Sequence, residues 1–378
     1  MHASLHRIAG QPSARFLPAF SLPCDHRVIA MASLSQLRTS MLVTIVLTLV
    51  IFVGFVGAVS LLYSAAAGLN LSPLSTLVGS FVLALIFLGI QFLISPSIVA
   101  WSTRLQYLQP GQYPWLENTV KELAGASGVA VPRLAIISNP TPNAFVFGNS
   151  SSKMTLAVHE GLLRQLNEDE VKGVLAHELG HVKHRDSIVM TVLSAIPLLA
   201  YMIARSTLYL GTGSRDRNRN AGYIALAGIV AMVVYFVAQL LVLRLSRLRE
   251  HFADVYSGYL TGSPRSLESA LTKIAYGLSM RPEDPQGVRA LYISDPALAR
   301  SEVQGILERK AQFDLYHDGV LSERELQLAM EKEAKSTWSG VNEAFSTHPP
   351  TYKRILLLRQ IEAELGHGSD ESTIYKRI

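Results

Sequence analysis

The sequence predicts a mainly α-helical membrane protein, in which helical transmembrane hairpins are combined with a polar α+β domain that contains a small β-sheet. Apolar residues make up 49% of the 378 residues and charged residues only 17%, whereas soluble proteins average about 25% charged residues. Four long apolar segments interrupt the polar sequence. Between them, strand-like segments precede sequence with helical periodicity. The chain is therefore expected to divide between a bilayer and water.

The first two apolar segments have the length of transmembrane helices. Residues 41–63 and 76–101 contain no charged residue, and each supplies the roughly 20 residues that a helix needs to cross hydrocarbon. The linker 64–75 is short and also uncharged. These features predict two transmembrane helices within residues 41–101, joined at a tip that lies opposite the basic flanks.

An N-terminal tail, residues 1–40, precedes the first span. It contains four arginines and many serines but a single acidic residue, Asp25, a composition that resembles a transit peptide. The interpretation we favour is a loosely structured or disordered tail, or a start site placed too early with Met31 as the natural beginning. No residue of this segment has a recognisable chemical role.

Polar sequence resumes over residues 102–186 and predicts the first part of a folded domain. Three segments have the composition of strands, at 133–138, 144–147 and 154–158, and they lead into a helix. A small sheet that precedes a helix is therefore expected here.

A second hairpin, residues 187–244, is predicted from two further apolar stretches at 188–204 and 222–243. The connecting loop 211–220 is rich in Arg, Gly and Asn and reads as a flexible connection. The sequence leaves open whether this hairpin crosses the bilayer or only associates with it. Residues 245–378 are polar again and predict the second, mainly helical part of the domain.

The basic residues near the spans indicate an orientation. Eight lie on the side of the polar domain and four on the opposite side, which predicts a multi-pass protein of the inner cell membrane whose polar domain faces the cytoplasm. The first group is Arg27, Arg38, Arg104, Lys183, Arg185, Arg244, Arg247 and Arg249, and the second is Arg205, Arg215, Arg217 and Arg219. The expected partner is the lipid bilayer. The net charge of +5 comes without a recognition motif, so no nucleic acid is expected; a homo-oligomer stays open.

A helix that begins near Asn167 carries the most specific chemical signal. Asn167 is followed by three acidic residues, the third at the capping-box position, which is typical of a helix start. His177 and His181 are four residues apart and project from one face, where two imidazoles can hold one zinc ion. Glu178 is angled away from the metal but can take a proton from a water beside it. This helix can run on past Asp186 into the second hairpin.

A third ligand has to come from elsewhere in the chain. The extended metalloprotease motif does not supply it, because His184 and Ser187 stand where Gly and His are required. Glu250 is the best candidate and would complete a site of two histidines and one glutamate. Asp254 lies on the same helical face and could accept the outward N–H of a liganding histidine. His251 and His184 are the alternative ligands.

Four segments and the paired leading spans resemble one family. The segments are Pro142–Phe145, Val174–Asp186, Ser246–Asp254 and Phe345–Arg354. They resemble the HtpX-like membrane zinc metallopeptidases, gluzincins related to the CAAX prenyl proteases. The resemblance implies that the polar parts on either side of the second hairpin form one gluzincin α+β peptidase domain. It also implies a polypeptide substrate, with endoproteolysis of misfolded or damaged membrane proteins as the task.

The resemblance assigns roles to particular residues. It implies that His177, His181 and Glu250 ligate one Zn²⁺ per chain, that Glu178 is the catalytic base, and that Asp254 supports a ligand. Hydrolysis would use a water activated at the zinc, without a covalent intermediate.

Two further sets of residues gain a role only from the resemblance. His348 and Arg354 are expected near the active site as cationic donors that stabilise the oxyanion or grip the peptide. The segment of Asn143, Ala144 and Phe145 resembles the edge strand on which gluzincins lay an extended substrate.

Two alternative functions remain open. A prenyl-protein endopeptidase of the CAAX type would carry more spans than the four candidates. A non-catalytic metal-binding transporter or sensor would not need Glu178, and its polar residues should lie within the spans.

Overall fold

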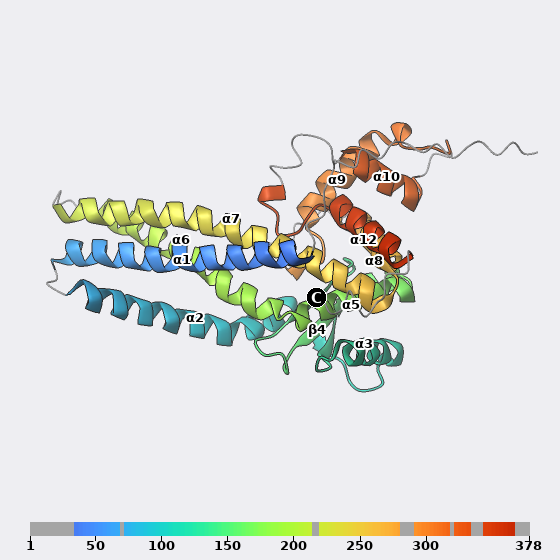
Figure 1. The fold of residues 1–378 in the computed structure, drawn as a ribbon, viewed down its shortest axis with the longest axis horizontal. Helices are drawn as coiled ribbons and strands as arrows, with labels where there is room; N and C mark the ends of the chain where they lie inside the picture. Colours follow the sequence, from blue (N-terminus) through green and yellow to red (C-terminus); the bar gives the residue numbers. More distant parts are fainter. Residues whose placement is uncertain are drawn as a thin grey trace, which may run out of the picture. The chain divides into compact units, whose positions relative to one another are not determined.

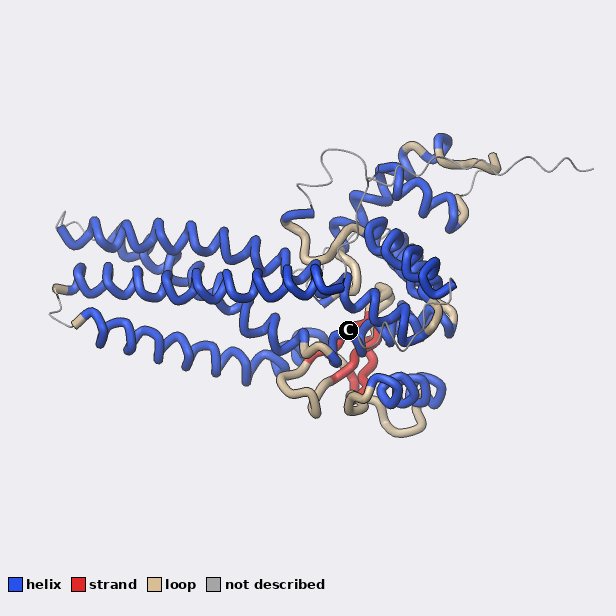
Figure 2. Tube along the Cα trace, viewed as in Figure 1, coloured by secondary structure: helices blue, strands red, loops and turns tan. Residues whose placement is uncertain are grey.

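The computed structural model describes residues 34–68, 72–213, 219–279, 291–317, 321–333 and 343–366. Within these ranges the chain is mostly helical and contains one small sheet (Figure 2). These elements confirm the predicted fold class. Most of the predicted tail at 1–40 lies outside the described residues.

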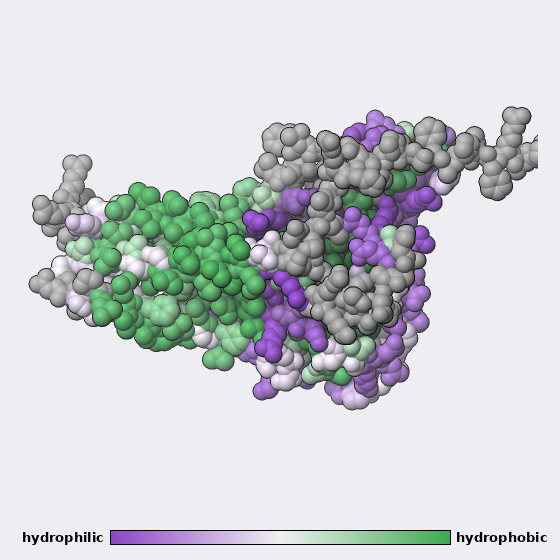
Figure 3. All heavy atoms as spheres, viewed as in Figure 1, coloured by the Kyte–Doolittle hydropathy of each residue, from purple (hydrophilic) through white to green (hydrophobic). Residues whose placement is uncertain are grey.

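Four helices are long and apolar enough to cross a membrane: α1 (Leu34–Ala67), α2 (Pro73–Thr103), α6 (Asp186–Gly213) and α7 (Arg219–Thr261). Figure 1 shows them running alongside one another, with α7 in contact with α1 and α6, and α2 in contact with α1 and α6. The apolar surface gathers over these helices in Figure 3. Both predicted hairpins therefore correspond to pairs of helices of spanning length.

Helix α7 continues well beyond the predicted end of its apolar part. It runs without a break to Thr261, so the expected boundary at residue 244 falls inside one helix. Where the side chains turn from apolar to charged, the helix passes from a lipid to an aqueous environment, but its backbone hydrogen bonds are not interrupted. The helix ends where Gly262 adopts a φ of 63° and Pro264 follows. One rigid element therefore reaches from the apolar helix layer into the polar domain.

The sheet has four strands in the order β1 (Gln106–Tyr107), β2 (Arg133–Ile137), β4 (Thr155–His159) and β3 (Ala144–Phe147). Strands β2 and β4 are parallel, and the other two pairings are antiparallel. The three predicted strands are confirmed to within a residue at either end, while β1 was not predicted. Strand β3 lies at an edge of the sheet.

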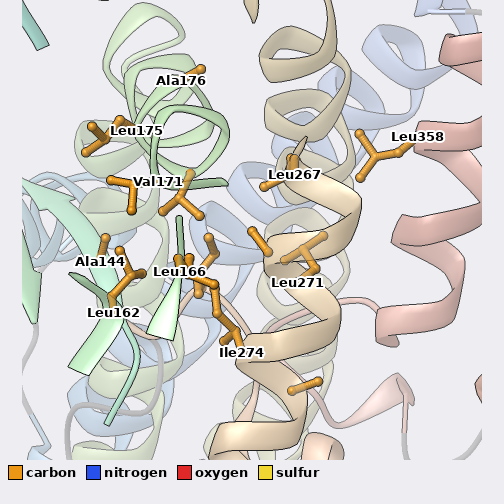
Figure 4. Packing of buried hydrophobic residues seen from close by; sticks show 14 of the residues in the cluster. Ala144, Leu162, Leu166, Val171, Leu175, Ala176, Leu267, Leu271, Ile274 and Leu358 are labelled. Carbon is orange, nitrogen blue, oxygen red and sulfur yellow. The ribbon is translucent and has the colours of Figure 1, made fainter. Parts of the chain in front are cut away.

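The polar domain is built around α5 (Glu168–Lys183), which packs against α3 (Pro114–Ser127), α7, α8 (Pro264–Ser279) and β3. The other helices of this domain among the described residues are α4 (Glu160–Gln165), α9 (Pro296–Glu308), the 3₁₀ helix η2 (Lys310–Gln312), α10 (Glu323–Glu333) and α12 (Thr351–Gly366). Figure 4 shows Val171 and Leu175 of α5 in one buried cluster with Leu267 and Leu271 of α8. Each fully buried leucine contributes roughly 1.5–3 kcal/mol, so this cluster holds α5 firmly in place.

Candidate metal centre

Helix α5 starts as its sequence predicts. The side chain of Asn167 accepts a hydrogen bond from Glu170 N, and Asn167 N donates to Glu170 Oε2, both at 2.9 Å. Glu170 also accepts hydrogen bonds from Ser269 and Lys273 on α8. The capping box therefore begins the helix and ties its first turn to a neighbouring helix.

The same helix ends before Asp186 and does not run into the second hairpin. Arg185 has a φ of 56°, in the left-handed region, and α6 begins at Asp186. This residue turns the chain between α5 and α6, so the expectation of one continuous helix is wrong. The turn leaves Asp186 beside the end of α5.

Three side chains converge on one point: His177 and His181 of α5 and Glu250 of α7. The two Nε2 atoms are 3.2 Å apart. Glu250 Oε2 lies 3.5 Å from His177 Nε2, and Glu250 Oε1 lies 3.4 Å from His181 Nε2. Tetrahedral zinc with bonds near 2.0–2.1 Å separates its ligand atoms by about 3.3 Å. These three residues therefore have donors and spacings that fit a metal ion.

Carboxylates behind both imidazoles decide which nitrogens face the site. Asp186 Oδ2 lies 2.7 Å from His181 Nδ1. Asp254 Oδ1 lies 3.0 Å from His177 Nδ1, although this contact is not aligned as a regular hydrogen bond. A carboxylate at Nδ1 favours a proton there and leaves Nε2 as a lone pair. The two lone pairs then face the two oxygens of the Glu250 carboxylate, His177 Nε2 toward Oε2 and His181 Nε2 toward Oε1. Electron-rich atoms gathered in this way would be stabilised by a cation between them.

Sequence reasoning placed Asp254 behind a histidine but missed Asp186. The available signal was the position of Asp186 directly after the helix that carries the two histidines. The alternative ligands lie outside the donor group. His184 Nδ1 contacts Gly180 O at 2.8 Å, and the His184 ring packs against aromatic rings of α7. His251 is not part of the group within the described residues.

The close approach of α5 and α7 depends on Gly180. A Cβ atom at this position would lie 3.1 Å from Tyr256 Cδ1 and 3.4 Å from Ala253 Cα. The first of these distances is tighter than ordinary van der Waals contact. Glycine therefore lets α7 lie near enough for Glu250 to reach the histidines of α5.

Arg354 lies behind the ligands rather than in the cleft. Its Nε and Nη2 donate to the two carboxylate oxygens of Asp254 at 2.8 and 2.6 Å, and its Nη1 donates to Ile293 O. The residue is 1% exposed and does not line the cleft beside the metal site. Its guanidinium is turned toward Asp254 and Ile293, and its Nη2 lies 3.6 Å from Glu250 Oε2.

His348 does line the cleft. Its Nε2 lies 3.7 Å from Glu250 Oε1, and its Nδ1 contacts Thr347 Oγ1 at 2.8 Å. Burial lowers the pKa of His348, although Glu250 acts in the opposite direction, so its environment disfavours the cationic form expected from the sequence.

The edge strand β3 lines the same cleft through Ala144 and Phe145. Asn143 has a different place: its side chain donates to Leu291 O at 3.1 Å and accepts from Ile293 N at 2.9 Å. This residue is fully buried. Its side chain therefore anchors the 291–293 segment, and only the strand that follows it faces the cleft.

The cleft has a volume of about 340 Å³ and extends from the metal site toward the apolar helices. Side chains of three of these helices line that end: Phe92, Pro96 and Val99 of α2, Met190 of α6, and Val242 and Leu243 of α7. Pro96 has no N–H, so the carbonyl oxygen of Phe92 lacks the usual helical hydrogen bond from this position. That oxygen instead accepts a long hydrogen bond, at 3.5 Å, from the side chain of Asn149, which follows β3. The cleft therefore joins the edge strand to the apolar helix layer.

The chain is similar in sequence to a known peptidase family. The model of peptidase family M48 matches residues 110–362. A protease HtpX homolog of Aeropyrum pernix is 34% identical over 287 residues, which cover 75% of this chain and 86% of the relative. A protease HtpX homolog of Methanothermobacter thermautotrophicus is 38% identical over 249 residues, which cover 65% and 91%. The crystal structure of S. mikatae Ste24p aligns with a TM-score of 0.44 and 17% identity, over 85% of this chain and 66% of Ste24p.

Proposed function

This chain belongs to peptidase family M48 as an HtpX-like membrane metalloprotease, and from this we propose that it is a zinc-dependent endopeptidase for misfolded or damaged membrane proteins. The observation that carries the proposal is the convergence of His177, His181 and Glu250 in a cleft that also holds Glu178. Family membership favours an enzyme over a transporter or sensor that uses the histidines only to bind metal.

Zinc is the metal that we propose for this donor set. Two imidazoles and one carboxylate are typical of catalytic zinc sites, which keep a fourth position open. Zinc bound there would polarise the scissile carbonyl and make a water acidic enough to lose a proton near neutral pH. Asp186 and Asp254 would hold the imidazoles in the tautomer that presents Nε2 to the ion.

Glu178 is the proposed general base and acid. Burial raises the pKa of its carboxyl group, although His181 and His177 act in the opposite direction. A raised pKa suits a group that takes a proton from the attacking water and passes it to the leaving amine. Glu178 also has a backbone hydrogen bond with Val146 of β3, which would hold the carboxylate beside the substrate strand.

Substrate would lie along β3 in an extended conformation. Among the described strands, β3 pairs with β4 alone, so its other edge would offer backbone groups that bind peptide with little sequence preference. His348 would act as a neutral donor: the Thr347 hydroxyl can donate to Nδ1, which leaves an Nε2–H for the oxyanion. For Arg354 we propose a positioning role: its guanidinium would hold the Asp254 carboxylate in place and would not touch the substrate.

Two features support membrane proteins as substrates and cytoplasmic cleavage. The apolar end of the cleft between α2, α6 and α7 suits a chain segment that emerges from the bilayer. The excess of basic residues beside the polar domain favours a cytoplasmic domain in the inner membrane.

The decisive experiment measures zinc content and proteolysis together. Casein and a membrane substrate are incubated with the detergent-solubilised protein, with and without a chelator that removes zinc. We expect Glu178→Gln to keep one zinc per chain and to lose on the order of 10²–10⁴-fold in rate. Glu168→Gln, an exposed acid of the same helix, is the control. A Glu178→Gln protein with bound zinc and full activity would refute the assignment.

A further inference from the structure

A stripe of side chains on α7 leads from the proposed metal ligand into the apolar part of that helix. Four residues of α7 that line the cleft recur every three or four positions and therefore lie on one helical face: Gln239, Val242, Ser246 and Glu250. Gln239 is about three turns, or roughly 16 Å, from Glu250 along the helix. It precedes Arg244, the first charged residue after the apolar run. The cleft thus continues into the part of α7 that is expected to lie in the bilayer.

Helices α6 and α2 also line the inner end of the cleft with polar groups. These are Thr191 and Ser194 of α6 and Ser95 of α2, and both helices are long and apolar enough to cross a membrane. Gln91, one turn before Ser95, donates to Thr191 O at 3.5 Å, while its Oε1 is buried without a hydrogen-bond partner. Polar side chains within spans are costly and typically line a cavity or a substrate path.

These groups differ from the hydroxyls of α1. Thr44, Thr48 and Ser60 are buried, and each donates to a carbonyl one turn earlier in its own helix. They lie outside the residues that line the cleft, and helix packing accounts for them. Gln239, by contrast, forms no hydrogen bond within the described part of the chain, although its amide has two donor hydrogens and an acceptor oxygen. Its amide is therefore available to a molecule in the cleft.

An unwound peptide is the occupant that fits this lining. In hydrocarbon every backbone N–H and C=O needs a partner, and a chain that leaves a helix loses the partners it had within the helix. Amide and hydroxyl side chains along the cleft would replace them. A lipid acyl chain has no group that bonds to such side chains, and the backbone of an intact helix is already satisfied.

Helix α2 leaves the inner end of the cleft beside the bilayer. Of its most apolar stretch, 6% is buried in the protein, against 28–33% in the other three spans. The same helix contacts the segment that follows β3, through the hydrogen bond from Asn149 to Phe92 O. A chain that enters beside α2 therefore reaches the edge strand without passing through the polar domain.

We propose that the cleft binds the unwound end of a transmembrane helix of the substrate, which enters from the bilayer beside α2, and that Gln239 is a specificity-determining residue for it. This inference rests on the proposed peptidase function. An extended chain covers about 3.3 Å per residue, so the path between Gln239 and Glu250 holds roughly five residues. The bond that is cut should therefore lie within about five residues of the end of the substrate's span.

Two membrane-anchored substrates test the proposal. Both carry the casein sequence that the wild type cuts, one about five residues from a transmembrane helix and one after a flexible Gly/Ser spacer of about 30 residues. Each is reconstituted with the zinc-loaded protein in liposomes, and the ratio of the two kcat/KM values is measured, near over distant. We expect a ratio of at least about ten in the wild type.

The expected effect of Gln239→Leu is a ratio at least about fivefold lower, because an amide that bonds to the substrate backbone is lost. Gln239→Asn keeps an amide and should retain more of the preference. Leu240→Val, at the next position and outside the cleft lining, is the matched control and should keep the wild-type ratio. Zinc content, measured in the same samples, reports whether each variant is folded at the metal site.

Two results would overturn the proposal and leave the peptidase function standing. One is a ratio near one in the wild type, which would mean that the cleft does not select bonds beside a span. The other is the same ratio in Gln239→Leu as in the wild type, the outcome expected if lipid fills the inner end of the cleft. A wild type that cuts neither substrate nor casein would instead contradict the proposed function, and this inference with it.

Discussion

Asp186 Oδ2 lies 2.7 Å from His181 Nδ1, across the turn that separates α5 from α6. The other oxygen of Asp186 accepts a hydrogen bond from Arg249, the residue before Glu250 on α7. One carboxylate therefore connects the histidine helix, the second hairpin and the helix that carries the third proposed ligand.

Replacing this carboxylate should weaken the metal site without removing a ligand. We expect Asp186→Asn to lower zinc affinity by about 10–100-fold, because His181 loses the partner that orients its ring. Competition with a chromophoric chelator measures this affinity. Asp169→Asn, an exposed acid in the first turn of α5, is the matched control, and equal affinities for the two variants would contradict the role of Asp186.

The variant Arg354→Lys distinguishes two possible roles of Arg354: holding the Asp254 carboxylate in place, or contacting the substrate directly. Lysine cannot reproduce the paired bonds of the Arg354 guanidinium to Asp254, so we expect weaker zinc binding as well as slower proteolysis. Chelator competition and peptidase rates are measured on the same preparation. Arg359→Lys tests a second arginine of α12 that pairs with a carboxylate. Unchanged zinc affinity with slow proteolysis in Arg354→Lys would restore an oxyanion role.

Glu302 should make the stability of the protein depend on pH. Burial raises the pKa of Glu302 from 4.5 to about 7; Oε1 accepts from Thr351 N, while Oε2 is buried without a partner. Since the folded-state pKa lies above the unfolded value, this contribution to stability is complete below about pH 4.5 and is lost as pH rises to about 7.

Glu302→Gln removes that titration and keeps a carbonyl oxygen that can accept from Thr351 N. We expect the variant to be more stable than the wild type at pH 8, by up to about 3 kcal/mol, and similar near pH 4.5. Unfolding temperatures at both pH values measure the difference, with the exposed Glu308→Gln as the control. An equal shift at both pH values would show that ionisation of Glu302 is not its cause.

The proposed orientation predicts which side of the membrane can be labelled. In a Cys24→Ser background, a membrane-impermeant maleimide should label Ser72→Cys in intact cells, because Ser72 begins α2 at the tip of the first hairpin. It should label Gln312→Cys in the polar domain only after permeabilisation. The reverse pattern would place the peptidase domain outside the cytoplasm.

Local spacing accounts for what the sequence could predict. Uncharged stretches of about 20 residues predict spanning helices because few other structures satisfy a backbone in hydrocarbon. The helical period places His177 and His181 on one face, and the capping signals at Asn167 locate the start of their helix. The same period placed Asp254 on one helical face with Glu250, the best candidate for a third ligand.

By itself, then, the sequence determined the spans, the histidine pair and the candidates around it. Only the tertiary structure decided which residues stand behind them: Asp186 depends on the left-handed turn at Arg185, and Arg354 depends on the packing of α12 against α7. Helical and strand periods describe neighbours along one element, whereas contacts between elements depend on how closely two surfaces pack. At this site that distance is set where Gly180 of α5 meets Tyr256 of α7.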